Sequence, residues 1–198
     1  DGVLFVNSSD TYLTEHHRRT KARVVNVVTN LEEIAVKFME ALGRELNISP
    51  DLIEEARDDF QPPAQRLNYE KVGPYTLLDD SYNSSPLAVK AALHLFKKLP
   101  APRVAILGSM KELGQLSESF NQEIVDYARG YADKFIAVGD EAKAFGFDKN
   151  YPDSVVAAAK IFEDLPASGS ILVKGSHSVQ MEKIVAAIRQ KYNPQPVK

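Results

Sequence analysis

The sequence has 198 residues, of which 44% are hydrophobic and 26% charged, with a formal net charge of -3. These values are ordinary for a globular protein, and the length fits one large domain or one domain with part of another. The small net charge gives no electrostatic reason to expect nucleic acid or an anionic membrane surface as a partner. The chain has no cysteine, which excludes disulfide bonds and thiolate metal sites and fits a reducing cytosol.

The first third of the chain, residues 1–66, is predicted to be part of a domain with mainly helical content. Residues 3–6 predict a short buried strand with no signal segment before it, so we expect the chain to begin inside a domain. Apolar residues at helical spacing predict a helix over residues 30–46. Ser49 and Pro50 predict the start of a second helix, as N-cap and first helical residue. We expect the domain boundary at residue 66.

Residues 67–198 alternate four times between strand-like and helix-like segments. The expected strands cover residues 75–78, 103–107, 134–138 and 171–173, and the helices cover residues 86–98, 117–129, 154–162 and 179–190. This alternation predicts an α/β fold with a Rossmann-like, mostly parallel sheet flanked by helices. Because ligands of such sheets bind beyond the carboxyl ends of the strands, the loops at those ends are the candidate site.

The loop after the first of these strands is unusually rich in polar chemistry, with two carboxylates, a phenol and an amide between residues 79 and 83. Asp80 could accept hydrogen bonds from a ribose, and Asn83 could recognise an amide or a phosphate. The alternative is turn and capping chemistry, with Ser85 as N-cap and Pro86 at the first helical position. We favour a functional role for Asp80 and Asn83, and capping for Ser85 and Pro86.

The loops after the second and fourth strands carry weaker signals. Gly108 permits a tight turn or close approach of backbone, whereas Met110 and Leu113 are typical of packing. Residues 174–178, with a lysine, two serine hydroxyls and backbone N–H groups before a helix, predict an anion site. The alternative is that Ser178 is a plain N-cap.

Other common sites find no support in the sequence. The glycine spacing near residue 175 is not that of a Walker motif. The four histidines show no ligand spacing that would predict zinc, so no metal site is expected; they are His16, His17, His94 and His177.

The polar motifs together resemble the Mur ligase family, and within it most closely the type that adds D-alanyl-D-alanine. The resemblance covers residues 60–190 and keeps the family's order and spacing. Its motifs are Arg66-Leu67, Asp79-Asp80-Ser81-Tyr82-Asn83, the segment 108–114 and Lys174-Gly175-Ser176. Less closely, residues 7–10 and a helix expected over residues 26–41 resemble the end of the family's central ATP-binding domain.

The resemblance implies an ATP-dependent amide ligase of peptidoglycan precursor synthesis. In the family, ATP with Mg²⁺ phosphorylates a peptide carboxylate, and an incoming amine attacks the acyl phosphate. The resemblance assigns ATP contacts to Arg66 at the phosphates, to Asp80 at the ribose with Asn83 nearby, and to Asn26 in the central-domain portion. It assigns the incoming substrate to four residues: Lys174, Ser176, His177 and Ser109.

The resemblance also implies partners. These are the family's N-terminal and central domains, a nucleotide-sugar peptide and a D-amino-acid dipeptide, in the cytoplasm, with neither nucleic acid nor membrane. The P-loop belongs to the central domain and is missing here. The chain alone is therefore expected to be inactive and to bind ATP weakly.

The sequence departs from the family pattern at positions where function is expected: Gln65 replaces a glycine, Ser109 an aspartate, Asn121 a histidine and His177 an arginine. In the central-domain portion, Val25 replaces a histidine and Thr29 an asparagine that the family has near the adenine. Two alternatives to a ligase therefore stay open. One is a divergent, non-catalytic homologue that binds a nucleotide or a peptide, and the other is an α/β scaffold used for protein interaction.

Overall fold

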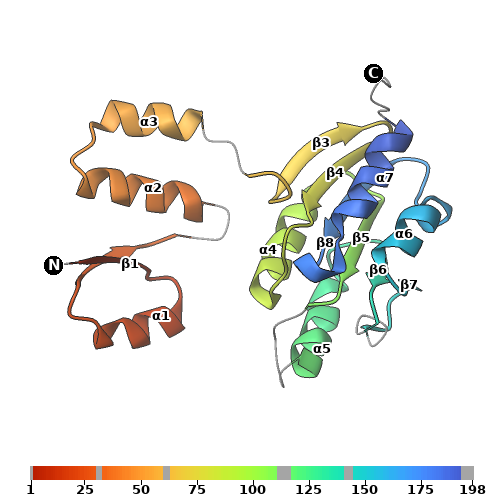
Figure 1. The fold of residues 1–198 in the computed structure, drawn as a ribbon, viewed down its shortest axis with the longest axis horizontal. Coiled ribbons are helices and arrows are strands. Elements are labelled where there is room, and N and C mark those ends of the chain that lie inside the picture. Colours follow the sequence, from red (N-terminus) through yellow and green to blue (C-terminus); the bar gives the residue numbers. More distant parts are fainter. Residues whose placement is uncertain (1, 30–32, 60–62, 111–116, 141–144, 193–198) are drawn as a thin grey trace. The chain divides into compact units, whose positions relative to one another are not determined.

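The computed structural model of the chain describes residues 2–29, 33–59, 63–110, 117–140 and 145–192 (Figure 1). The backbone forms two compact units, Asp1–Gln61 and Pro62–Lys198. The sequence predicted a domain boundary at residue 66, and that boundary stays a prediction. Within the described residues, none of the helices is long and apolar enough to cross a membrane.

The first unit contains two parallel strands and two longer helices. Strands β1 (Val3–Asn7) and β2 (Arg23–Val27) pair in parallel, and α1 (Thr11–His16) with a 3-10 turn lies between them in the chain. Helices α2 (Ile34–Glu45) and α3 (Pro50–Asp58) follow. The predicted start of α3 is confirmed, because the Ser49 hydroxyl accepts a hydrogen bond from the Leu52 amide and Pro50 is the first helical residue.

The expected helix over residues 26–41 was wrong in its first part. Asn26 lies in β2, directly opposite Val6 of β1. The reason is local, because three of the five residues of β2 are valines, and β-branched side chains favour the pleated strand. Helix α2 begins only at Ile34.

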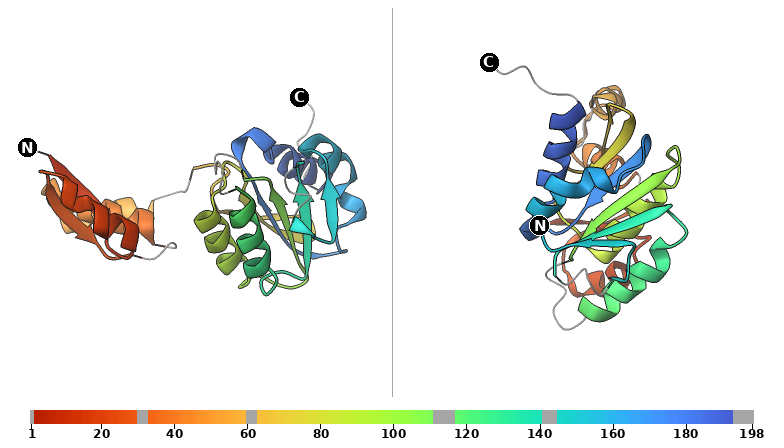
Figure 2. Two further views of the ribbon diagram at one scale, coloured as in Figure 1. Left: turned by 90° about the horizontal axis from the view of Figure 1, so that it is seen from below. Right: turned by 90° about the vertical axis from the view of Figure 1, so that its right-hand side faces the viewer.

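The second unit is built on a six-stranded sheet in the order β3-β4-β8-β5-β6-β7 (Figures 1 and 2). Strand β3 is antiparallel to β4, and the other five strands run parallel. The strands are β3 (Asn68–Val72), β4 (Tyr75–Asp80), β5 (Arg103–Gly108), β6 (Lys134–Val138), β7 (Lys149–Tyr151) and β8 (Gly169–Lys174). The predicted mostly parallel sheet is confirmed, and the four predicted strands are its interior ones.

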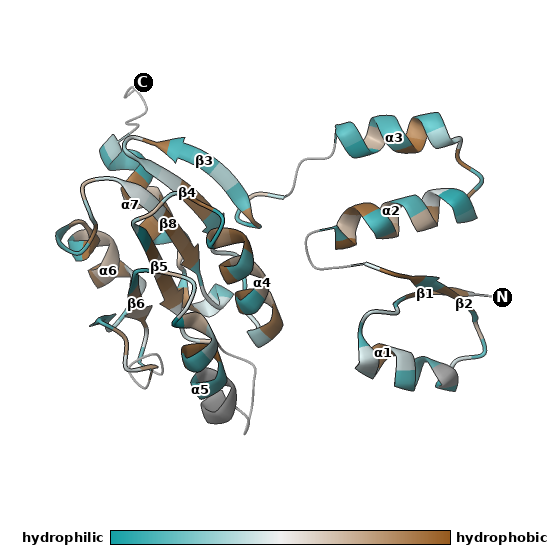
Figure 3. Cartoon of the chain, turned by 180° about the vertical axis from the view of Figure 1, so that it is seen from behind, coloured by the Kyte–Doolittle hydropathy of each residue, from teal (hydrophilic) through white to brown (hydrophobic). Residues whose placement is uncertain are grey.

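Helices cover both faces of this sheet, as predicted. Helices α4 (Pro86–Phe96) and α5 (Ser117–Ala128) pack on one face. Helices α6 (Ser154–Lys160) and α7 (Glu182–Tyr192) pack on the other. Because both faces are buried, the middle residues of the central strands are mostly apolar, which Figure 3 shows as brown ribbon.

The last helix starts later than predicted. Residues His177–Val179 form a 3-10 turn that ends at Gln180, whose φ of 57° lies in the left-handed region, and α7 begins at Glu182. The left-handed residue interrupts the helical path. Ser178 is therefore not the N-cap of α7, and the capping interpretation of this residue was wrong.

Candidate active site at the carboxyl edge of the sheet

The strand order brings the three polar loops together. Strand β8, the last in the chain, lies between β4 and β5, so the loops after Asp80, Lys174 and Gly108 leave adjacent strands at the same edge. Lys174 is directly opposite Asp80 in one ladder and Leu107 in the other. The predicted convergence of these loops on one edge of a parallel sheet is confirmed.

The centre of this edge is a buried ion pair. The Lys174 side chain is only 2% exposed, and its ammonium Nζ lies 2.6 Å from Oδ2 of Asp80. The same Nζ donates a hydrogen bond of 2.8 Å to the backbone carbonyl of Asn83. One lysine thus joins the end of β4 to the loop that follows it.

Asp80 also forms a hydrogen bond with the segment that precedes β3. Its Oδ1 accepts a hydrogen bond of 3.2 Å from the backbone N–H of Leu67, which adjoins Arg66. Burial raises the pKa of Asp80 above its usual value of 3.8, although the Lys174 ammonium and the Leu67 N–H act in the opposite direction. The carboxylate is therefore held between two donors, the Lys174 ammonium and the Leu67 N–H, and is largely buried from solvent.

Arg66, Tyr82 and His177 form an exposed stack beside this pair. The Arg66 guanidinium carbon lies 4.4 Å from the centre of the Tyr82 ring, and the His177 ring centre lies 5.4 Å from it. The backbone N–H of Tyr82 donates to the Gln65 carbonyl at 3.1 Å. The structure thus places Arg66 and His177 on the same tyrosine, which the sequence did not predict.

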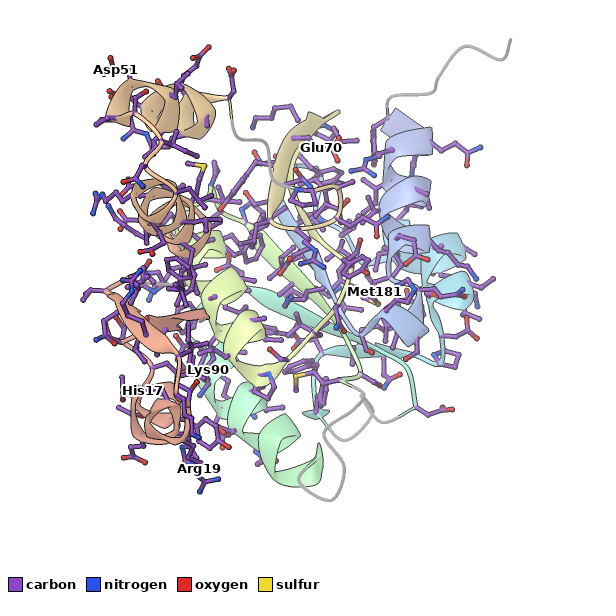
Figure 4. All side chains as sticks on the ribbon, turned by 60° about the vertical axis from the view of Figure 1, so that its left-hand side comes forward. His17, Arg19, Asp51, Glu70, Lys90 and Met181 are labelled. Atoms are coloured by element: carbon purple, nitrogen blue, oxygen red, sulfur yellow. The ribbon has the colours of Figure 1, made fainter. Side chains whose placement is uncertain are left out.

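Two glycines let the loops approach each other closely. A Cβ added at Gly175 would lie 3.0 Å from the Gly108 Cα and 2.6 Å from a side-chain carbon of Met181, which Figure 4 labels. The Ser176 N–H donates to the Ser109 carbonyl at 3.2 Å across the same gap. The predicted close approach of backbone at Gly108 is confirmed, and the partner is Gly175.

A second charged cluster lies on the α7 face of the sheet. Arg189 of α7 donates to Asp79 Oδ2 at 2.9 Å and, through Nε, to Glu70 Oε1 of β3 at 2.8 Å (Glu70 is labelled in Figure 4). Asp79 is fully buried, and its Oδ1 accepts from the Ser81 hydroxyl at 2.6 Å and from the Ser81 N–H. Sequence reasoning missed Arg189, since a basic residue in the last turn of a helix carries no distinctive signal.

The remaining candidate residues differ in their accessibility. Ser109 and Ser176 are buried, whereas Asn83 and His177 are exposed. The Asn83 side-chain oxygen accepts from the adjoining Ser84 N–H. Asn26 belongs to the other unit.

The predicted helix cap is confirmed, because the Ser85 hydroxyl accepts from the Ala88 amide and Pro86 begins α4. Met110 is buried in the core, as predicted. Leu113 lies outside the described residues, as does the side chain of Asn121.

The fold and this edge define the class of protein: an α/β domain with a Rossmann-like, mostly parallel sheet whose charged and polar groups gather at the carboxyl ends of its central strands. Residues 65–197 match the family described as Mur ligase, glutamate ligase domain, and the chain belongs to that family.

Curated relatives carry the name UDP-N-acetylmuramoyl-tripeptide–D-alanyl-D-alanine ligase. The protein of that name from Escherichia coli (strain K12) is 31% identical over 121 residues, which cover 58% of this chain and 27% of the relative. The one from Rickettsia prowazekii is 35% identical over 160 residues, covering 75% of this chain and 34% of the relative. The matches thus span only about a quarter to a third of these relatives.

Solved structures share the fold. The MurF ligase from Thermotoga maritima, in complex with ADP, has a TM-score of 0.79 at 18% identity, covering 96% of this chain and 53% of that one. A MurF structure from Acinetobacter baumannii has a TM-score of 0.79 at 20% identity, covering 96% of this chain and 52% of that one.

Proposed function

We propose that this chain supplies the C-terminal domain of a cytoplasmic, ATP-dependent amide ligase of peptidoglycan precursor synthesis. The reaction joins D-alanyl-D-alanine, or a similar amine, to a UDP-N-acetylmuramoyl peptide. The observation that carries the proposal is the meeting of the Arg66, Asp80 and Lys174 segments at one sheet edge, in a member of the Mur ligase family.

ATP, when bound with Mg²⁺, would supply the phosphoryl group that activates the peptide carboxylate. The residues at the edge fit a nucleotide. The exposed Arg66 guanidinium lies over the Tyr82 ring, where a planar cation with several donors suits a phosphate. Each Asp80 oxygen uses one described donor and can accept another, as a ribose hydroxyl requires. Asn83 is exposed beside it.

The incoming amine substrate is assigned to the neighbouring loop. His177 is exposed next to Tyr82 and can offer a ring N–H to a carboxylate. The Ser176 hydroxyl lies 3.4 Å from the Ser178 hydroxyl, and Ser109 lies across the gap between the two glycines. In this proposal these side chains bind and orient the dipeptide. Asn26, in the central-domain portion of the chain, is assigned to ATP.

Catalysis requires more than this chain. The sequence has no Gly-x-x-Gly-Lys-Thr loop to hold the ATP phosphates. We therefore assign the P-loop and the Mg²⁺ ligands to the central domain, and most of the nucleotide-sugar site to the N-terminal and central domains. Phosphate release by the purified 198-residue chain with Mg·ATP would contradict this assignment.

The decisive experiment is a domain exchange. Residues 62–198 replace the corresponding domain of the E. coli relative, and product formation and phosphate release are measured. We expect ligation that falls at least about tenfold with Arg66→Ala, because one charge-assisted phosphate contact is lost. A hybrid no more active than the E. coli enzyme without its C-terminal domain would overturn the proposal.

A second candidate function is a non-catalytic module that binds a nucleotide or a peptide. It is favoured by Ser109, a buried hydroxyl where the resemblance leads us to expect a carboxylate. Calorimetric titration of the 198-residue chain separates the two functions. The ligase proposal expects at most weak binding of ATP and of D-alanyl-D-alanine, whereas micromolar affinity for either favours the binding module.

A further inference from the structure

We propose that Lys174 is a positioning residue, whose buried ammonium fixes Asp80 and the Asn83 loop and, through Asp80, the segment that carries Arg66. The contacts of Lys174 with Asp80 and the Asn83 loop are observed in the structure whatever the protein's activity is. The consequence for ligation rests on the proposed function.

The burial of Lys174 is the first argument. A lysine that is 2% exposed must keep its charge paired and hydrogen-bonded, because an unpaired ammonium in a dry place is strongly unfavourable. Two of its three N–H donors are directed to Asp80 Oδ2 and to the Asn83 carbonyl. With 2% of the side chain exposed, little of the ammonium is open to a substrate.

The second argument is the path of contacts from Lys174 to Arg66. Asp80, which the ammonium holds through Oδ2, accepts the Leu67 N–H through Oδ1. The Asn83 loop, which the ammonium holds through a carbonyl, carries Tyr82, whose N–H binds the Gln65 carbonyl. Both neighbours of Arg66 are thus tied to groups that Lys174 fixes.

The backbone around Arg66 needs such restraint. Gln65 has a φ of 63° and Leu67 a φ of 50°, so two residues with side chains adopt the left-handed conformation on either side of Arg66. This conformation is unfavourable for both residue types and persists only where surrounding contacts determine it. The bonds to Tyr82 N–H and Asp80 Oδ1 provide those contacts.

The test measures amide hydrogen exchange by NMR in the 198-residue chain without ligands. In Lys174→Met, we expect the Leu67 and Tyr82 amides to exchange at least about tenfold faster than in the wild type, because the ammonium no longer holds Asp80, which accepts the Leu67 N–H, or the loop that carries Tyr82. Exchange of both amides within about twofold of the wild-type rates would overturn the proposal.

A matched control is available at the opposite end of the sheet. Lys134 begins β6 and pairs with Asp164 at 3.0 Å. Lys134→Met also removes a Lys–Asp pair, although Lys134 is 33% exposed and Lys174 only 2%. We expect it to leave the Leu67 and Tyr82 amides at their wild-type rates. Faster exchange at these two amides in the control would mean that the response is global, which would count against a positioning role.

A double variant covers the case in which Lys174→Met fails to fold. Asp80→Asn with Lys174→Met leaves no unpaired charge, and the asparagine oxygen can still accept the Leu67 N–H. We expect the Tyr82 amide to exchange faster than in the wild type, because the Asn83 loop has lost the ammonium. The Leu67 amide keeps a neutral acceptor at residue 80 and should exchange more slowly than in Lys174→Met. A wild-type exchange rate of the Tyr82 amide in this variant would contradict the proposal.

The ligation measurement separates positioning from substrate contact. In the domain-exchange hybrid, a positioning role predicts that Lys174→Met lowers kcat, with the KM for D-alanyl-D-alanine within about twofold of its original value. A direct contact predicts a raised KM and unchanged amide exchange, which would overturn the inference. Because the exchange experiment uses no substrate, an inactive hybrid would count against the proposed function and leave the positioning result standing.

Discussion

Asp79 and Asp80 are consecutive residues of β4, yet their carboxylates lie on opposite faces of the sheet and pair with different cations. Arg189 of α7 donates to Asp79 at 2.9 Å, and the Lys174 ammonium of β8 lies 2.6 Å from Asp80. The cause is the strand itself, in which successive side chains alternate between the two faces. Two residues that look equivalent in sequence therefore make unlike contributions to stability.

Lys174→Met should lower the free energy of unfolding by about 3–5 kcal/mol, because it leaves the Asp80 carboxylate buried without its cation. The double variant Asp80→Asn with Lys174→Met should recover most of this loss. Urea unfolding of the two single variants, the double variant and the wild type gives the coupling energy. Additive effects of the two substitutions would contradict the prediction.

Arg189→Met should cost less, about 1–2 kcal/mol. Asp79 would keep its hydrogen bonds from the Ser81 hydroxyl and N–H, and Arg189 is itself 43% exposed, so that solvent already screens its charge. The same urea experiment measures this loss. A larger loss than that of Lys174→Met would show that the α7 face has the more important ion pair.

Gly175→Ala should destabilise the second unit by about 1–3 kcal/mol, since the new methyl group would meet Met181 at 2.6 Å and Gly108 Cα at 3.0 Å. Gly130→Ala is the matched control, because a Cβ there has no described neighbour within 4 Å. Thermal unfolding compares the two variants. Equal shifts in Tm would mean that the close approach at Gly175 is not what the substitution disturbs.

Asp164→Asn should make the free energy of unfolding decrease less steeply as the pH falls. Burial alone would raise the pKa of Asp164, but hydrogen bonds from the Tyr151 hydroxyl and the Lys134 ammonium outweigh it and lower the pKa below 3.8. The unfolded chain therefore binds the proton more readily, so this contribution is present above pH 3.8 and disappears as the pH falls through the folded pKa.

The measurement is urea unfolding of the wild type and of Asp164→Asn from about pH 7 to pH 3. The variant should be less stable at neutral pH, and the difference from the wild type should shrink on acidification. A difference that stays constant across this range would refute the assignment.

Gln65→Gly should change stability by less than about 0.5 kcal/mol. Glycine removes the penalty of a left-handed residue, about 1 kcal/mol, but adds a similar amount of chain entropy to the unfolded state. Gln65→Val, with a β-branched side chain at a φ of 63°, should be clearly destabilising. If valine were tolerated as well as glycine, the left-handed conformation at this position would be in doubt.

The sequence predicted the second unit better than the first. Its four interior strands were found because both faces of the sheet are buried, which makes each strand a continuous apolar run between turn residues. Strand β3, with the sequence Asn-Tyr-Glu-Lys-Val, was missed because an edge strand with mixed polarity has no such run. Strand β7 was missed because it has only three residues.

Within the site, the structure brings Asp80, Asn83 and Lys174 to one edge of the sheet, as expected, because each residue follows or ends an apolar strand. Their contacts could not be foreseen. Arg189 lies 110 positions from Asp79, and Lys174 lies 91 positions from Asn83. Contacts over such distances depend on strand order and register, which local patterns do not contain.

By itself, the sequence determined the alternation of strand and helix and the kinds of side chain at the strand ends, because burial and turn formation act on neighbouring residues. The tertiary structure alone decided that the last strand is inserted between β4 and β5 and that Lys174 faces Asp80. The tertiary structure also decided that the Lys174 ammonium is buried inside the domain, since the direction of a side chain follows from the register of its strand against the neighbouring strands.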